Sequence, residues 1–443
     1  MPNRQPLSLI DSIEDRTERG IAAAVSRLIT SRQLIAGHRL PTVRVVASGL
    51  GVSPTTVSEA WQTLGRAGLI ESRGRLGTFV LGPVGDPRPH RYRRITDAPG
   101  TYRLDLSTGT PDPALLPDIS RLLAKVDQRN LTHSYMDNPV LPKLADVLDG
   151  MWPFVPEAVT VVDGVLDGID RVASALLNYG DRVVVENPCF APLLDLFDLM
   201  GAEVIPVELD SQGIVPASLA AALTREPVAL FLQPRAHNPT GISMTAGRAR
   251  ALAKLIAPTS CVVVEDDHSG AAASAPLASI GRHLPGRSVY ILGFSKSHGP
   301  DLRLAAIGGS SAVINKVVAR RSLGAGWSSR ILQSVLAAML TDLSVQQQVA
   351  TASQTYQQRR QRLVRLLNDR EIATVGTDGI NVWMPVAQEQ SCLLTMAAFG
   401  VALAPGTPFL AVPMLQDHVR VTVGLVTDEF EMLADQLAVA ASR

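Results

Sequence analysis

Apolar residues in the first 80 positions follow a helical period and then form short extended runs. Apolar side chains recur at every third or fourth residue over three segments, which predicts three helices: 13–34, 43–50 and 54–67. The third helix has a strong start signal, because the Ser53 oxygen accepts an unpaired backbone amide and Pro54 has no amide to leave unpaired. Two apolar runs follow at 69–72 and 77–80, and they predict a hairpin.

Three helices followed by a hairpin are typical of a winged helix-turn-helix, whose third helix enters the major groove of DNA. The start of that helix would present polar side chains to the bases: Ser53, Thr55, Thr56 and Ser58. Arginines on the second helix and at the tip of the hairpin would contact phosphates: Arg44, Arg73 and Arg75. We therefore expect residues 8–81 to bind double-stranded DNA.

The chain from residue 104 to residue 443 has a different pattern, in which short β-branched runs alternate with helical segments. Seven of these runs are predicted strands: 159–162, 182–185, 204–207, 228–232, 261–264, 289–292 and 304–307. The alternation predicts an α/β fold with a mostly parallel sheet covered by helices on both faces. Residues 82–103 lie between the two patterns, are rich in Pro and Gly and have no apolar period, so we interpret them as a linker with no role beyond connection.

Composition supports a basic module joined to an acidic body. The chain has 443 residues with 41 basic and 41 acidic side chains, but residues 1–94 hold 14 Arg against 7 acidic residues. The three cysteines are far apart and suggest neither a disulfide framework nor a metal site. No signal peptide or spanning apolar stretch is evident, so a cytoplasmic protein with no membrane contact is expected.

Residues with reactive or polar side chains follow the predicted strands. Ligands of parallel sheets bind at these carboxyl ends of the strands. The strand ends supply Phe190, Asn238, Asp266 or Asp267, and Lys296, with Arg303 seven residues further on. A lysine that forms a Schiff base with an aldehyde coenzyme would fit this set, since an Asp keeps a pyridine nitrogen protonated. Hydroxyls and a cation for a phosphate would come from Ser295, Ser297 and Arg303, with backbone amides after Asp163 and Gly164.

These segments resemble two known families. LPTVRVVASGLGVSPTTVSEAWQTLGRAGLIESRGRLGTFV is similar to the GntR-type regulator module. QPRAHNPTG, VVVEDDHSG and GFSKSHGPDLRLAAIGG resemble blocks of the fold-type I pyridoxal-phosphate aminotransferases, as do LDLSTGTPDPALLP, VALAPGTPFL and HVRVTVG. The combination is identified as the MocR subfamily of bacterial regulators. It implies pyridoxal 5′-phosphate as cofactor and a smaller C-terminal α+β subdomain beside the main sheet.

The resemblance also implies roles for single residues. Lys296 would bind the coenzyme aldehyde and act as the catalytic residue, Asp266 would face the pyridine nitrogen, and Asn238 would bond the ring hydroxyl. Phe190 would stack on the ring, Arg303 would hold the phosphate, and Arg420 would bind an amino-acid carboxylate. Further cofactor contacts are implied at Ser295, Ser297, His268, Val165 and Tyr135. Tyr135 corresponds to a tyrosine that reaches the neighbouring subunit's phosphate, which implies a homodimer.

Two departures from the aminotransferase pattern bear on function. His268 stands where the family usually has a tyrosine, and an ordinary imidazole would make the coenzyme spectrum sensitive to pH near neutrality. Val165, Leu166 and Asp167 replace small polar residues and glutamines after Asp163-Gly164, which would put an anion near the phosphate. Both changes weaken the case for efficient turnover and leave coenzyme capture plausible.

Three functions remain open from the sequence. The leading hypothesis is a transcription regulator whose aminotransferase-like domain senses an amine, an amino acid or a B6 vitamer. The second is a working aminotransferase with an accessory winged helix, and the third is a DNA-binding protein whose body binds no coenzyme. The effector, the operator and the choice between Asp266 and Asp267 are not set by the sequence.

Overall fold

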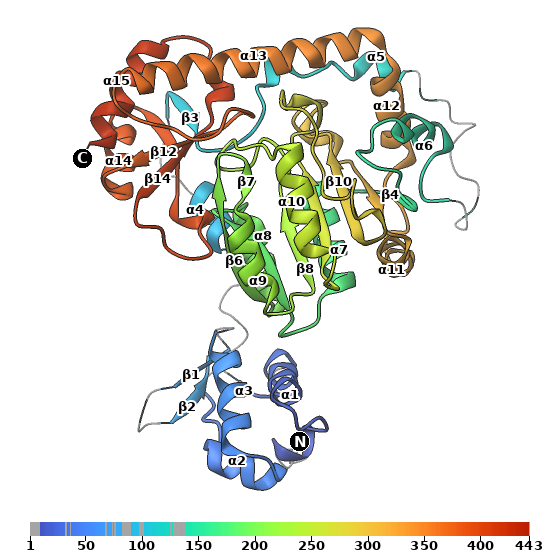
Figure 1. The fold of residues 1–443 in the computed structure, drawn as a ribbon, viewed down its shortest axis with the longest axis vertical. Helices are drawn as coiled ribbons and strands as arrows, with labels where there is room; N and C mark the ends of the chain where they lie inside the picture. The colour runs from blue at the N-terminus through green and yellow to red at the C-terminus, as the bar shows by residue number, and fades with distance from the viewer. Residues whose placement is uncertain are drawn as a thin grey trace, which may run out of the picture. The chain divides into compact units, whose positions relative to one another are not determined.

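The computed structural model describes residues 9–31, 33–35, 37–66, 69–72, 74, 77–81, 90–96, 102–124, 126, 134 and 138–442. Two compact units make up the chain, one built mainly from the first 89 residues and the other from most of the rest (Figure 1). The domain boundaries predicted from the sequence, 8–81, 82–103 and 104–443, stay predictions. Arg73, Arg75 and Tyr135 lie outside the described residues.

The smaller unit has the predicted order of helices and strands. Its elements are α1 (Glu18–Thr30), α2 (Val43–Leu50), α3 (Pro54–Arg66), β1 (Ile70–Ser72) and β2 (Thr78–Val80). The two strands pair antiparallel, and the helices bury a common apolar core that includes Ile21, Val57 and Leu64. The first helix starts later than its apolar pattern suggested, because the Thr17 hydroxyl accepts the amide of Gly20 and caps the helix there.

The larger unit contains an eight-stranded sheet. Its strands are β4 (Ala158–Val162), β5 (Arg182–Asn187), β6 (Glu203–Asp210), β7 (Gly213–Ile214), β8 (Ala229–Leu232), β9 (Val262–Asp267), β10 (Ser288–Gly293) and β11 (Ala305–Gly309). They lie in the order β4-β11-β10-β9-β8-β5-β6-β7. The pairs β5–β8, β8–β9 and β9–β10 are parallel, and β11 runs antiparallel to both of its neighbours. All seven predicted strands are present, and the two-residue β7 extends the sheet to eight.

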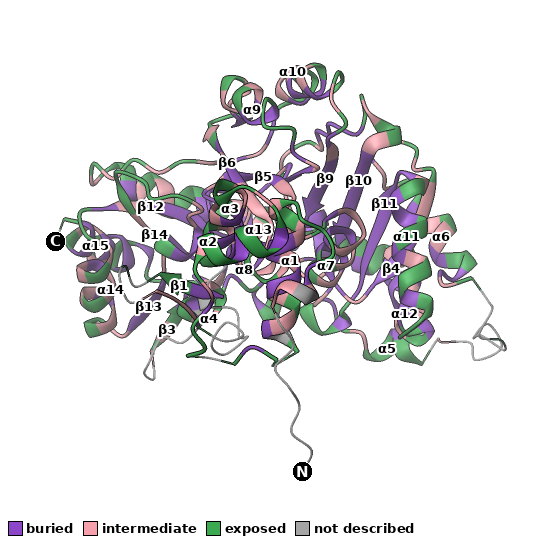
Figure 2. Ribbon diagram, turned by 90° about the horizontal axis from the view of Figure 1, so that it is seen from below, coloured by how far each residue is buried: buried purple, intermediate pink, exposed green. Residues whose placement is uncertain are grey.

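Helices cover both faces of this sheet, as the alternating pattern predicted. The helices in this part of the chain are α5 (Ser120–Leu123), α6 (Pro142–Asp149), α7 (Val165–Leu176), α8 (Ala191–Met200), α9 (Pro216–Leu223), α10 (Ala246–Ile256), α11 (Ser311–Ser322), α12 (Arg330–Thr341) and α13 (Leu343–Asn368). In Figure 2 the buried strands β5, β9 and β10 lie between α9 and α10 on one side and α7 and α8 on the other. The core strands are therefore apolar on both faces.

A second sheet forms the expected smaller subdomain. It has the order β12-β14-β13-β3, from β12 (Val382–Val386), β14 (Asp417–Val421), β13 (Val401–Pro405) and β3 (Leu104–Leu106). Helices α14 (Glu389–Ala398) and α15 (Phe430–Ala441) share one core with its strands. Because β3 pairs with β13, residues just after the predicted linker lie beside the C-terminal part of the chain. The α/β fold and its α+β subdomain are thus confirmed.

A helix, α4 (His90–Thr96), lies inside the predicted linker. The sequence pattern did not predict it, since only Ile95 of its apolar residues is buried, at 4% exposure. That side chain packs in a cluster with Ala191, Trp383, Ala404 and Phe409 of the larger unit. This part of the linker therefore belongs to a packed surface. Within the described part of the chain, no helix is both long and apolar enough to cross a membrane.

The cap of α3 gives the first testable prediction. The Ser53 hydroxyl accepts the amide of Thr56 at 3.1 Å, so Ser53→Ala leaves that amide unpaired and should destabilise the helix by about 1 kcal/mol. Amide hydrogen exchange within α3 would measure the loss, as faster exchange than in the wild-type chain. Thr55→Ala, at an exposed position of the same turn, is the control and should leave exchange in α3 close to wild type.

Candidate functional site

The carboxyl ends of β5, β8, β9 and β10 bring the predicted site residues together. Phe190 follows β5, Gln233 follows β8, Asp266 lies at the end of β9, and Lys296 follows β10. A small cavity is lined by Phe190, Gln233 and Asp266, so the predicted stacking ring and the predicted carboxylate face one space. The sheet topology alone explains why these residues lie close together, because neighbouring parallel strands end at the same edge of the sheet.

Hydrogen bonds connect the site from Asp266 to Arg420. Gln233 donates its amide nitrogen to Asp266 Oδ2 at 2.7 Å and accepts the backbone amide of Asn238 at 2.7 Å. The Asn238 oxygen in turn accepts a hydrogen bond from Arg420 at 3.2 Å. Three of the predicted residues, Asp266, Asn238 and Arg420, therefore form one connected network, held by a glutamine that the sequence reasoning did not single out. Gln233 directly follows a strand, so the rule that located Asp266 would also have found it.

The loop after β3 supplies hydrogen-bond acceptors to Lys296 and to Arg420. The Lys296 amine donates to the carbonyl oxygen of Gly109, and Arg420 donates to the carbonyl oxygen of Ser107. Gly109 has a φ of +65°, and a Cβ there would lie 3.1 Å from the guanidinium nitrogens of Arg420. Glycine is required at this position both for its backbone conformation and for the space that Arg420 occupies.

The two neighbouring aspartates have different environments, and the difference favours Asp266 for the role that the sequence left open between them. Both carboxylate oxygens of Asp267 have hydrogen-bond partners: Arg235 donates to them at 3.0 and 2.7 Å, and the Tyr290 hydroxyl donates to one of them at 2.7 Å. Asp266 Oδ1 is buried and has no hydrogen-bond partner. Only Asp266 therefore has an oxygen free to accept a proton-bearing nitrogen.

Electrostatics at Asp266 fit a cationic ligand. Burial, together with the nearby charges of Asp267 and Glu186, raises the pKa of Asp266 to about 7, against the hydrogen bond from Gln233. A protonated ring nitrogen at Oδ1 would supply the missing positive charge and the missing hydrogen bond. The unpaired oxygen offers a pyridinium nitrogen an acceptor, and the raised pKa reflects a buried carboxylate whose charge no neighbouring cation in the described part of the chain offsets.

Lys296 has an amine that is easily deprotonated. Burial lowers its pKa to about 8, and the positive charge of Arg420 adds to the effect. A neutral amine is the form that attacks an aldehyde. The lowered pKa thus increases the fraction of this amine that is neutral at a given pH.

His268 does not behave as the sequence suggested. Burial lowers the pKa of His268 to about 3, and the neighbouring Lys296 charge contributes in the same direction. Its Nε2 lies 3.2 Å from the Ser269 hydroxyl, and its Nδ1 is buried without a partner. The expected titration near neutrality is wrong, because a buried imidazole beside a cation stays neutral.

The predicted phosphate contacts lie around the start of α7. Arg303 donates to the carbonyl oxygen of Asp163 at 3.0 Å, and a Cβ at Gly164 would lie 3.0 Å from its guanidinium. Val165 is the first residue of α7, so the backbone amides of its first turn and Arg303 are in one place. The expected conflict with Asp167 is relieved, because its carboxylate accepts hydrogen bonds from Arg171 at 2.8 Å and from the Asp163 amide at 3.0 Å.

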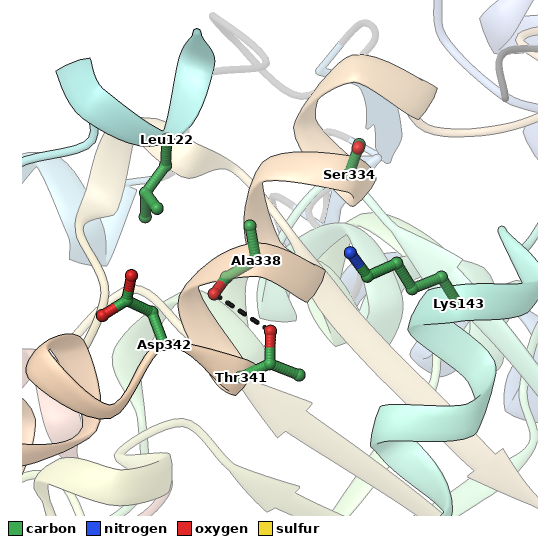
Figure 3. A pocket seen from close by; sticks show the side chains of 6 residues that line it. All are labelled: Leu122, Lys143, Ser334, Ala338, Thr341 and Asp342. Carbon is green, nitrogen blue, oxygen red and sulfur yellow. Dashed lines mark hydrogen bonds between the residues drawn. The ribbon is translucent and has the colours of Figure 1, made fainter. Parts of the chain in front are cut away.

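Two serines near Lys296 differ in their surroundings. Ser297 is buried, and its hydroxyl contacts His298 Nδ1 at 2.8 Å, so it is already paired. Ser295 is half-buried. A different pocket, of about 290 Å³, is lined by Leu122, Lys143, Ser334, Ala338, Thr341 and Asp342, and includes none of the predicted site residues (Figure 3).

On the smaller unit, the described DNA-contact candidates lie at or near the surface. Arg44 and Thr55 are exposed, and Ser58 is half-buried. The hydroxyls of Ser53 and Thr56 contact each other at 2.9 Å, so these two serve the start of α3 as well. The exposed start of α3 is the surface that a winged helix presents to the major groove.

Known proteins match both units. Residues 17–80 match the family of bacterial regulatory proteins of the gntR type, and residues 102–437 match the aminotransferases of class I and II. The vitamin B6 salvage pathway transcriptional repressor PtsJ of Salmonella typhimurium is 35% identical over 97% of this chain and 100% of its own length. The HTH-type transcriptional regulator TauR of Rhodobacter capsulatus is 27% identical over 87% of this chain and 88% of its own. This chain belongs to the MocR subfamily.

Solved structures confirm the fold of the larger unit. Kynurenine aminotransferase from Pyrococcus horikoshii has a TM-score of 0.72 at 21% identity, covering 80% of this chain and 94% of its own. LysN, the α-aminoadipate aminotransferase of Thermus thermophilus, has a TM-score of 0.70 at 22% identity, covering 81% of this chain and 95% of its own. This MocR protein is therefore a DNA-binding transcription regulator with an aminotransferase domain, and the cofactor expected from the family, pyridoxal 5′-phosphate, is confirmed.

The different roles of the two aspartates can be tested by the same substitution at each. Asp267→Asn leaves the buried charge of Arg235 unpaired and should lower the free energy of unfolding by about 3 kcal/mol. Asp266→Asn removes a charge that burial already disfavours, so it should keep stability and weaken coenzyme affinity by about tenfold. Denaturant unfolding and visible absorbance titration measure the two effects. The reverse pattern would assign the ring nitrogen to Asp267.

The lowered pKa of Lys296 predicts how coenzyme capture depends on pH. The rate of capture should rise about tenfold per pH unit below pH 8, because the neutral amine fraction rises, and should level off above it. Stopped-flow absorbance after mixing coenzyme with coenzyme-free protein measures this rate. Lys296→Ala should lose the visible band that borohydride removes and keep the circular dichroism of the folded chain. A rate that keeps rising to pH 10 would contradict the lowered pKa.

Proposed function

We propose that this regulator senses pyridoxal 5′-phosphate itself, and that filling the site in the larger unit changes the affinity of the smaller unit for DNA. Two facts support this choice of effector. The relative named as a vitamin B6 salvage pathway repressor is similar over its whole length. Hydrogen bonds also link Asp266, Asn238 and Arg420 through Gln233, and Lys296 and Arg420 both donate to the loop after β3.

The single observation that carries the proposal is the unpartnered Oδ1 of buried Asp266. A regulator without coenzyme would gain nothing from an unsatisfied carboxylate in its core, which costs stability. When bound, the coenzyme supplies an aldehyde for an amine, a ring nitrogen that takes a proton and a phosphate. Lys296 provides the amine, Asp266 the anion, Asn238 a hydrogen bond to the ring, and Arg303 a cation for the phosphate.

Other predicted contacts have supporting roles in this proposal. Phe190 packs on the ring, Arg420 binds a carboxylate where an amino acid joins the coenzyme, and Tyr135 completes the phosphate site of a neighbouring subunit. The protein would act in the cytoplasm as a homodimer, because two winged helices read paired half-sites. An effector that moves the DNA-binding population from 1:99 to 99:1 must prefer one state by ~5.5 kcal/mol, which covalent capture makes accessible.

The function is tested by selecting a DNA duplex from a random-sequence library with the purified protein. We expect a defined sequence to be enriched, and its dissociation constant to change when pyridoxal 5′-phosphate is added to coenzyme-free protein. In a further arm of the experiment, L-alanine is added together with the coenzyme. A further change in the dissociation constant would show that an amino acid contributes to the response. Failure to enrich any sequence, or an identical affinity with and without coenzyme, would refute the proposal.

Arg44 provides a sharper test of the DNA-binding surface. Arg44→Ala should lower the affinity for the selected duplex and for an unrelated duplex by the same factor, because a phosphate contact carries no sequence information. The slope of log affinity against log salt should fall by about one, the release of one counterion. Thr55→Ala is the contrasting variant, and it should lower the affinity for the selected duplex more than the affinity for an unrelated one. A change of sequence preference in Arg44→Ala would show that Arg44 reads bases.

The intact site also favours transaminase activity as a second candidate function. Lys296 and Arg420 lie in one network, so an amino acid held by its carboxylate would present its Cα close to the amine. Repeated release of a keto acid from a panel of amino acids would establish turnover. A single stoichiometric release, or none, would leave sensing as the function of the larger unit.

A further inference from the structure

The short helix α4 is held in place by a carboxylate from another helix. Asp195 of α8 accepts the backbone amide of Arg91 at 3.2 Å and that of Tyr92 at 3.0 Å, in the first turn of α4. It also accepts the Arg91 guanidinium at 3.3 Å. A negative charge on first-turn amides stabilises a helix at its positive end. Because seven residues are too few to be helical alone in water, α4 depends on this docking for its structure.

An apolar anchor fixes the other end of α4. Ile95 is buried against Phe409 and Trp383, and these two rings meet edge to face at 5.8 Å. The carbonyl oxygen of Phe409 also accepts the amide of Cys189, next to the predicted stacking ring Phe190. The surface that receives α4 is therefore continuous with the loop that borders the coenzyme cavity.

The same surface touches the arginine of the site. The Arg420 guanidinium carbon lies 5.0 Å from the centre of the Phe409 ring, so Phe409 is packed between Arg420 and the cluster that holds Ile95. Burial lowers the pKa of Arg420 to about 10, against a smaller opposing contribution from Tyr92 of α4. Arg420 is thus joined to the site network by a hydrogen bond, and through the Phe409 ring to the cluster that holds Ile95.

We propose that α4 is the element that transmits the state of the coenzyme site to the DNA-binding unit. Filling the site changes the partners of Arg420, Arg420 moves against Phe409, and the fit of Ile95 and Tyr92 changes with it. Because α4 begins only nine residues after Leu81 along the chain, its docking sets where the tether to the winged helix starts. This inference rests on the proposed function and names the route by which it acts.

The proposal is tested by measuring coupling in full-length variants. The coupling factor is the ratio of the DNA dissociation constants with and without pyridoxal 5′-phosphate, using the selected duplex. Asp195→Ala removes the carboxylate that caps α4, and Ile95→Ala removes its anchor. Asp149→Ala is the control, since it deletes the same charge at an exposed position of α6.

In Asp195→Ala and in Ile95→Ala we expect the coupling factor to move toward one, the value without coupling, by about fivefold or more. In Asp149→Ala it should stay at the wild-type value. Both test variants should keep the visible absorbance of bound coenzyme, because neither side chain contacts the site. By linkage, the effect of DNA on coenzyme affinity should fall by the same factor. A wild-type coupling factor in both variants would overturn the role of α4 and leave the proposed function standing.

A measurement on the wild-type chain covers the case in which a variant does not fold. Amide exchange in 90–96 should change about threefold or more when coenzyme is added to coenzyme-free protein, because α4 docking responds to the site. Unchanged exchange there would overturn the inference. A wild-type protein that binds neither coenzyme nor DNA would instead overturn the proposed function itself.

Discussion

A carboxylate buried with one oxygen unpaired is the constraint on which the larger unit depends. Asp266 sits at the end of a central strand, where burial and two neighbouring acids penalise its charge. Gln233 stabilises only one of its oxygens, the other has no hydrogen-bond partner among the described residues, and the residue lines a cavity together with Phe190. The cheapest way to satisfy such a group is a cation with a hydrogen to donate. The rest of the site is arranged so that a pyridine ring can provide it.

The neighbouring aspartate shows what the same residue does when it is purely structural. Asp267 is fully buried, yet Arg235, Tyr290 and a backbone amide satisfy it. One strand end therefore carries two carboxylates in opposite situations, one fully paired within the protein and one with an unpaired oxygen. Alternation along a β-strand explains the difference, since successive side chains point to opposite faces.

The two units share a chain and differ in the kind of recognition they offer. The winged helix carries the basic surplus and exposes Arg44 and Thr55, whereas the larger unit encloses a reactive amine. The helix α4 lies between them in sequence and packs on the surface behind Arg420. In the route that we propose, no large movement at the coenzyme itself would be needed, because a change in the packing of one ring would act on α4.

The sequence by itself determined the winged helix, the alternation that makes the main sheet, and the residues at its strand ends. These features depend on local period and on the rule that parallel strands end together, so they can be read along the chain. It did not predict α4, the neutrality of His268 or the division between Asp266 and Asp267. Each of these is decided by burial and by partners from distant segments: Asp195 lies 104 residues from Arg91, and Arg235 lies 32 residues from Asp267. Only the folded structure brings such groups together, and desolvation and pairing act only once they meet.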